Sequence, residues 1–302
     1  MPTKVRFTTW TLRYNEMFWV KVEGLEKHWQ PARVEAEILN PHAISIQSAN
    51  VTALTLFMPA GLCPLDSVLR PEVRLNGEKL EAPRVASDGS WKARFMNRGG
   101  RWSAVHSFEE GTLRKRPGLQ GPIDDAFMDS FILVRPTGDA LNADVEKWVA
   151  SELENSIGEW RDQFRGDARV KFDTEITESD IAENNLILWG DQQSNRLLAR
   201  IADKLPIRWD RKSLTAGSRT FDAPQHLPVL IYPNPLNGNR YVVLNSGFTF
   251  AHPVSASNAD QTPKLPDYAI VDISGPDSVG AAGNVVEAGF FDEQWRLPIS
   301  GK

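Results

Sequence analysis

The chain has 302 residues, of which 41% are hydrophobic and 24% are charged, so we expect a folded globular protein and not a disordered chain. Its formal net charge of −5 argues against nucleic acid as the main partner. No stretch approaches ~18 consecutive apolar residues, which predicts no membrane-spanning helix, and residues 1–10 lack the apolar core of a signal peptide. The single cysteine, Cys63, excludes an internal disulfide framework and a cysteine-built zinc site.

The first part of the chain, residues 1–114, has the pattern of β-strands. Aromatic and β-branched residues are frequent, and apolar and charged residues alternate over 33–40, with the two-residue period of a half-buried strand. Three dipeptides favour tight hairpin turns, namely Asn76-Gly77, Asp88-Gly89 and Gly99-Gly100. Short strands with regular turns and no long helical pattern predict a β-sandwich, either immunoglobulin-like or jelly-roll-like.

Residues 115–127 contain two prolines and two glycines and little periodicity, which indicates a linker or domain entry. The charge also changes sign there, with +5 over residues 1–116 and −10 over residues 117–302. This change is consistent with two domains, or only with differently solvated surfaces.

After this segment, residues 128–302 alternate between apolar strand-like runs and helical patterns. The longest pattern, over 139–166, spaces its apolar residues by three and four, which predicts an amphipathic helix. Strand–helix alternation predicts an α/β domain with a mostly parallel sheet, flavodoxin-like or Rossmann-like, followed by a loop-rich tail. The first expected strand is at 130–138, and five more are expected at 168–177, 185–191, 227–235, 240–247 and 267–274. A short helix or turn is expected at 178–185, and a further helix at 192–206.

Searches for catalytic motifs return nothing. The chain contains no G-x-S-x-G nucleophile elbow, no G-x-G-x-x-G fingerprint, no Walker A loop and no H-E-x-x-H zinc motif. The sequence therefore predicts no catalytic residue, no metal site and no cofactor for this chain by itself.

One group of polar residues does follow the predicted strands. In an open parallel sheet the carboxyl ends of the strands meet at one edge, where ligands bind. We therefore expect a crevice for a polar ligand formed by Thr137, Asp191, Ser194, Asn195, Asn234 and Asn245. The alternative, which we favour, is that Asp191, Ser194 and Asn195 cap the following helix while the other asparagines hold loops.

The ten tryptophans are many for this length, and five of them are in the β region: Trp10, Trp19, Trp29, Trp91 and Trp102. An exposed row of tryptophans would suit stacking against carbohydrate, but roles in the core are favoured.

Several motifs along nearly the whole chain resemble a known family. They are found at residues 7–15 (FTTWTLRYN), 50–56 (NVTALTL), 115–138 (KRPGLQGPIDDAFMDSFILVRPTG), 184–195 (NNLILWGDQQSN), 232–235 (YPNP), 241–247 (YVVLNSG), 264–272 (KLPDYAIVD) and 288–295 (AGFFDEQW). The pattern resembles the long C-terminal extension of large secreted α/β-hydrolases of the prolyl oligopeptidase type from planctomycete-like bacteria. In such proteins the nucleophile, acid and histidine lie in an upstream hydrolase domain, and no position here matches them.

The resemblance implies a secreted or extracytoplasmic location and an upstream α/β-hydrolase domain as the partner. Its implied function is a non-catalytic accessory region that docks on the catalytic domain, restricts access to it or binds its peptide substrate. One alternative is a stand-alone hydrolase acting on esters or peptides at the sheet-edge crevice, for which Ser246, His252 and Asp191 would be the conceivable triad. A second alternative is a module that binds polysaccharide or a cell surface through the β-sandwich.

Overall fold

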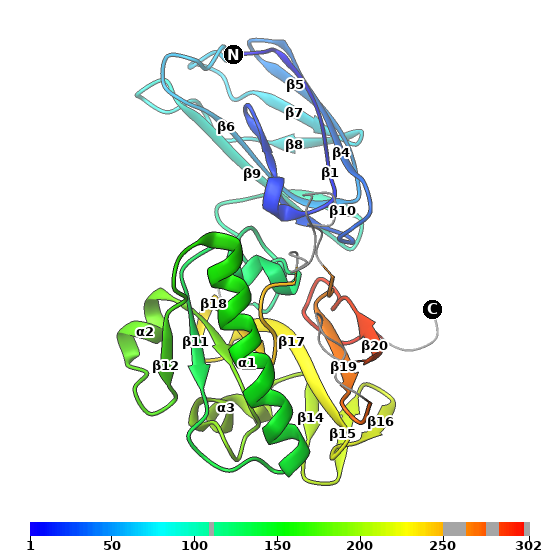
Figure 1. Ribbon diagram of the computed structural model, residues 1–302. Coiled ribbons are helices and arrows are strands. Elements are labelled where there is room, and N and C mark those ends of the chain that lie inside the picture. Colours follow the sequence, from blue (N-terminus) through cyan, green and yellow to red (C-terminus); the bar gives the residue numbers. More distant parts are fainter. Residues whose placement is uncertain (109–111, 250–263, 276–283, 299–302) are drawn as a thin grey trace. The chain divides into compact units, whose positions relative to one another are not determined.

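The computed structural model describes residues 1–108, 112–249, 264–275 and 284–298. The chain divides into two compact units, Met1–Gln120 and Gly121–Lys302, which are shown in Figure 1 and described separately below. The division falls within residues 115–127. In the part of the chain that is described, 41% of the residues lie in strands and 16% in helices, so the protein is mostly β.

The first unit contains two five-stranded sheets. One has the order β1-β4-β5-β7-β8 and the other the order β10-β9-β6-β3-β2. The strands are β1 (Lys4–Thr9), β2 (Glu16–Met17), β3 (Val20–Leu25), β4 (Ala32–Asn40), β5 (Ala43–Ala49), β6 (Val51–Met58), β7 (Glu72–Leu75), β8 (Glu78–Glu81), β9 (Trp91–Arg98) and β10 (Arg101–Val105), with the short helix η1 (Leu12–Tyr14).

The two sheets contribute apolar side chains to one core cluster. Alternation places these side chains inside: Val5 and Phe7 of β1 are buried while their neighbours are exposed. Trp19 and Trp91 are almost fully buried in this core, and each donates its indole N–H to a backbone carbonyl, of Pro2 and Pro83 respectively. This arrangement is consistent with the β-sandwich that the sequence predicts.

The second unit is built on a seven-stranded sheet of order β12-β11-β13-β18-β17-β19-β20, beside a small three-stranded sheet of order β14-β15-β16. The strands are β11 (Phe131–Arg135), β12 (Val170–Phe172), β13 (Asn185–Leu188), β14 (Ile207–Trp209), β15 (Ser213–Ala216), β16 (Arg219–Asp222), β17 (His226–Asn234), β18 (Asn237–Leu244), β19 (Tyr268–Asp272) and β20 (Asn284–Gly289). The helical segments are η2 (Ile123–Phe127), α1 (Ala143–Phe164), α2 (Glu178–Glu183), α3 (Arg196–Ile201) and η3 (Ala202–Lys204).

The prediction of a mostly parallel, flavodoxin-like or Rossmann-like α/β domain is wrong. Among the described strands of the seven-stranded sheet, only the pairs β11–β12, β11–β13 and β13–β18 are parallel, whereas β18–β17, β17–β19 and β19–β20 are antiparallel. The sheet is therefore mixed, and too few helices are present to cover a doubly wound fold.

The physical reason is the connection between β17 and β18. Asn234 pairs with Asn237, so only Pro235 and Leu236 separate the two strands. A link of two residues closes an antiparallel hairpin, while a parallel pair needs a crossover of a dozen residues or more. The strands were expected, but this short link reverses the direction of β17 within the sheet.

The helix α1 carries the crossover from β11 to β12 (Figure 1). Val145, Val149 and Leu153 are buried along one side of it, at the spacing that its sequence predicts. It ends where Arg165 adopts a left-handed conformation with φ of 57°. Across the residues with a described placement, no helix is both long and apolar enough to traverse a membrane.

Candidate functional site

Four of the six residues chosen from the sequence do meet at the carboxyl edge of the parallel strands. Asp191, Ser194 and Asn195 follow β13, and Asn245 follows the neighbouring strand β18. All four side chains are buried, with at most 3% of their surface exposed. Buried polar groups need hydrogen-bond partners, and the identity of those partners decides what this edge can do.

Asn245 joins the ends of two strands. Its Oδ1 accepts from the backbone N–H of Gly190 at 2.8 Å, and its Nδ2 donates to the carbonyl of Gly190 at 3.0 Å and to that of Pro228 at 3.3 Å. The residue has a φ of 50°, a left-handed conformation that asparagine tolerates better than most residues. The amide side chain therefore forms the same kind of hydrogen bonds with the backbone as a neighbouring strand would.

The Asp191 carboxylate organises the loop between β13 and α3. Its Oδ1 accepts from the backbone N–H groups of Gln193 and Ser194, both at 2.9 Å, and its Oδ2 accepts from the N–H of Leu141 at 2.7 Å. The Ser194 hydroxyl accepts from the N–H of Asp191 at 2.9 Å. The side chain of each of these two residues thus accepts the backbone N–H of the other, and the bond from Leu141 holds the segment that leads to α1.

Asn195 is the N-cap of α3. Its Oδ1 accepts from the N–H groups of Leu197 and Leu198, and its Nδ2 donates to the carbonyl of Trp189 at 3.0 Å. Asp173, which the sequence analysis did not select, reaches the same helix start, because its Oδ2 accepts from the N–H of Arg196 at 2.7 Å. The strand expected at 168–177 includes Asp173, whereas β12 ends at Phe172, so the sequence contains no sign that Asp173 follows a strand. The capping interpretation fits these contacts.

The other two residues do not join this group. Asn234 lies at the opposite edge of the sheet, because β17 runs antiparallel to β18 and ends where β18 begins. There its Oδ1 accepts from the N–H of Leu236 in the hairpin link. Thr137 is exposed in the loop after β11, where the next residue, Gly138, donates its N–H to the carbonyl of Ser194. Asn234 is therefore separated from the other five residues, contrary to the expectation, which assumed a parallel sheet, whereas Thr137 follows a parallel strand at the same edge but is exposed.

Little open space remains at this edge. The cavity that Asp191, Gly190 and Asn245 line has a volume of about 10 Å³, which is at the lower limit for holding a single water molecule. Gly190 has a φ of 101°, and a Cβ atom at this position would lie 2.4 Å from the Ser194 hydroxyl. The edge is filled by its own side chains and backbone.

The contacts of the conceivable hydrolase residues are of the same kind. The Ser246 hydroxyl donates to the carbonyl of Gly247 at 2.8 Å, and the Asp191 carboxylate is bonded to its own loop and Leu141. His252 lies outside the described residues. Where placement is described, no cluster of three or more His, Cys, Asp or Glu residues is arranged to hold a metal ion.

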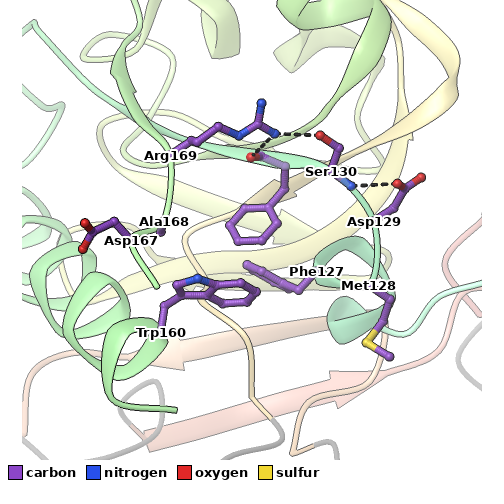
Figure 2. Close-up of a pocket in the computed structure, with 9 residues that line it drawn as sticks. Phe127, Met128, Asp129, Ser130, Trp160, Asp167, Ala168 and Arg169 are labelled. Atoms are coloured by element: carbon purple, nitrogen blue, oxygen red, sulfur yellow. Dashed lines mark hydrogen bonds between the residues drawn. The ribbon is translucent and has the colours of Figure 1, made fainter. Parts of the chain in front are cut away.

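A larger cavity, of about 300 Å³, lies at the amino edge of the parallel strands (Figure 2). It is formed by the segment from η2 to β11, the last part of α1 and the loop before β12, and it is lined by Phe127, Met128, Asp129, Ser130, Phe131, Trp160, Asp167, Ala168 and Arg169. The sequence does not predict this cavity, because Phe127 falls in the expected linker of residues 115–127 and the other lining residues come from separate elements.

No family model matches the chain, and neither the search of characterised proteins nor that of solved structures found a match. The function must therefore be inferred from the residues of the two edges and from the exposed surface.

Proposed function

We propose that this chain is a non-catalytic accessory region of a secreted serine hydrolase, a peptidase or esterase, in which it docks on the catalytic domain, restricts access to it or binds its substrate. The hydrogen bonding at the carboxyl edge is the observation that carries the proposal. Asp191, Ser194, Asn195 and Asn245 use their polar atoms to hold the backbone of neighbouring loops. An edge built in this way supports a scaffold. The Ser194 hydroxyl does reach Asp191 Oδ1 at 3.2 Å, but that carboxylate already accepts from three backbone N–H groups, which makes it a poor base for activating a serine.

An antibody against the chain tests the proposal in the source cells. We expect it to detect a polypeptide much larger than 33.8 kDa in the extracytoplasmic fraction, and we expect a fluorophosphonate probe to label that polypeptide. The probe reacts with serines that a neighbouring base activates, so the isolated 302-residue chain should stay unlabelled. If the isolated chain is labelled, the variants Ser194→Ala and Ser246→Ala show whether either serine is the labelled residue. A band at 33.8 kDa alone, or labelling that either variant abolishes, contradicts the accessory function.

A second function, binding of polysaccharide or a cell surface, is favoured by exposed aromatic side chains in the first unit. Trp19, Trp91 and Trp102 are buried, but Trp10 and Trp29 are 50% and 39% exposed. The backbone N–H of Trp29 donates to the carbonyl of Trp10 at 2.8 Å, so the two residues are neighbours. Exposed aromatic rings of this kind can stack on the flat faces of sugars.

A pull-down with insoluble polysaccharides tests this second function. If it is correct, Trp10→Ala should weaken the affinity for the polysaccharide about two- to tenfold, because one stacked aromatic ring contributes roughly 0.5–1.5 kcal/mol beyond its buried area. Phe57→Ala is the control, since Phe57 is also exposed, at 47%, but lies on β6. Equal retention of the wild-type chain and Trp10→Ala on every polysaccharide would exclude a role of Trp10 in carbohydrate binding.

A further inference from the structure

The cavity at the amino edge of the second unit has the size and the lining of a small-molecule site. Its volume of about 300 Å³ is at the lower end of the range for such sites, which combine apolar walls with a few polar groups. Figure 2 shows Trp160 and Phe127 on one side of a further aromatic ring, with Arg169 and Ser130 on its other side. The nine lining residues all belong to the second unit.

The apolar side of the cavity consists of aromatic rings. The rings of Phe127 and Phe131 meet edge to face at 5.1 Å between centroids, and those of Phe131 and Trp160 do so at 4.7 Å. Trp160 continues this cluster to Phe248 at 5.6 Å. Phe127 and Phe131 are buried, while Trp160 is half-buried. Edge-to-face contacts hold the rings in fixed orientations, and a planar ring can join such a cluster without moving them.

The polar side presents a cation in a fixed position. The Nη2 atom of Arg169 donates to the Ser130 hydroxyl at 2.7 Å, to the Phe131 carbonyl at 2.9 Å and to Asn184 Oδ1 at 2.7 Å. Each of these bonds uses Nη2, and within the described ranges no bond uses Nε or Nη1. These contacts orient the planar guanidinium and leave Nη1 as a single donor for a ligand.

The acids at the rim do not neutralise this cation. Asp129 is 2.8 Å from Nη1 of Arg240, and Asp167 is 2.5 Å from Nη2 of Arg161, so each carboxylate has its own arginine. Among the residues whose placement is known, no carboxylate lies within ion-pair distance of Arg169. The cavity therefore offers an anion site adjacent to a cluster of aromatic rings.

We propose that this cavity binds a small aromatic carboxylate. The ring lies against Trp160 and Phe127, and one carboxylate oxygen accepts a hydrogen bond from Nη1 of Arg169. A hydrogen bond between a guanidinium and a carboxylate is charge-assisted, which makes it stronger than a bond between neutral groups. Such a group occurs in free aromatic acids and at the C-terminus of a peptide that ends in an aromatic residue.

Methionine methyl groups provide the readout, because Met128 lines the cavity and is 54% exposed. The chain has five methionines, so ¹³C-methyl labelling gives five signals. The signal that disappears in the Met128→Leu variant is the one from the cavity. The probe is 3-phenylpropionate, titrated to about 10 mM, since a ligand of this size binds with Kd of about 1 mM. We expect the Met128 signal to shift and saturate, while that of Met58, buried in the first unit, stays in place.

Two comparisons test the part played by Arg169. Arg169→Gln should weaken binding about tenfold or more, because one charge-assisted contact is lost. Arg200→Gln removes a half-exposed arginine on α3 and should leave Kd unchanged. On the wild-type chain, 3-phenylpropionamide should also bind about tenfold more weakly than the acid. This second comparison needs no substitution and decides the question even if Arg169→Gln does not fold.

A third comparison distinguishes the two sources of the carboxylate. The tripeptide Ala-Ala-Phe with a free C-terminus should bind more tightly than 3-phenylpropionate if the natural ligand is a peptide end, and more weakly if it is a free acid. A Met128 signal that does not move, or an amide that binds as tightly as the acid, overturns the proposal.

Discussion

Asn245→Asp is expected to lower the free energy of unfolding by about 4 kcal/mol or more, because it replaces a donor with a buried charge. The Nδ2 atom of Asn245 donates to the carbonyls of Gly190 and Pro228, and a carboxylate oxygen in its place would face both acceptors. Asn245→Ala should cost about 3 kcal/mol, since it leaves the buried N–H and carbonyl of Gly190 unpaired and puts alanine at a φ of 50°. Urea unfolding followed by circular dichroism measures both changes.

The control for Asn245 is Asn76→Asp. Asn76 also has a left-handed backbone, with φ of 51°, and also bonds to the backbone of a neighbouring strand, at Ser48, but its side chain is exposed. Water can replace its hydrogen bonds, so we expect a loss of about 1 kcal/mol or less. Similar losses for Asn76→Asp and Asn245→Asp would show that burial at the carboxyl edge is not what makes Asn245 important.

Asp124→Asn is expected to remove a large part of the pH dependence of stability. Burial raises the pKa of the Asp124 carboxyl to about 6, and the hydrogen bonds that it accepts from the N–H and hydroxyl of Thr249 only partly oppose this effect. The pKa of this carboxyl is ~3.9 in the unfolded chain and about 6 in the folded chain. Between pH 4 and pH 6, the carboxyl has therefore lost its proton in the unfolded chain but keeps it in the folded chain. Stability from this group is therefore full below pH 4 and falls as the pH rises to 6, by about 3 kcal/mol in total.

The Asp124→Asn variant has no proton to lose, so its free energy of unfolding should fall by about 2 to 3 kcal/mol less than that of the wild-type chain between pH 4 and pH 8. Urea unfolding at a series of pH values measures the difference. Asp129→Asn serves as the control, because it removes an exposed acid from the same segment and should leave the pH dependence of unfolding nearly unchanged. Parallel pH curves for Asp124→Asn and the wild-type chain would show that Asp124 ionises in the folded state without cost.

The positions of many elements could be predicted from the sequence, but the directions of the strands could not. The apolar run at 185–191 contains β13, the run at 240–247 overlaps the second half of β18, and the helical spacing over 139–166 contains α1. An apolar run, however, has the same composition whichever way its strand points. Direction was set by the link at Pro235 and Leu236, whose length was not weighed against the crossover that a parallel pair requires.

The small sheet β14–β16 was missed because its strands are short and its residues mixed in polarity. Ala216 pairs with Arg219, so Gly217 and Ser218 form a two-residue turn between β15 and β16. A glycine followed by serine between two strand-like runs is a hairpin signal, and it was available in the sequence. The run before it, at 207–209, is too short to have been recognised on periodicity alone.

At the candidate site, the sequence indicated the polar residues but not their partners. Asn245 and Asp191 were chosen because polar residues follow apolar strands, and that choice needs only local sequence. Their partners, Gly190, Pro228 and Leu141, are brought to them by tertiary folding. The aromatic cavity could not be predicted from the sequence for the same reason, since Phe127 and Arg169 become neighbours only when β11 and β12 pair.

The hairpin of β17 and β18 also has a consequence for the kinetics of folding. Its two strands are joined by two residues, so little loop-closure entropy opposes their pairing. The parallel pair of β13 and β18 instead requires closure of the chain between Leu188 and Leu244, which includes the whole three-stranded sheet. The hairpin can therefore form early and present the edge of β18 to β13. An all-parallel sheet has no such hairpin, so here the reversed strand β17 provides a local folding nucleus.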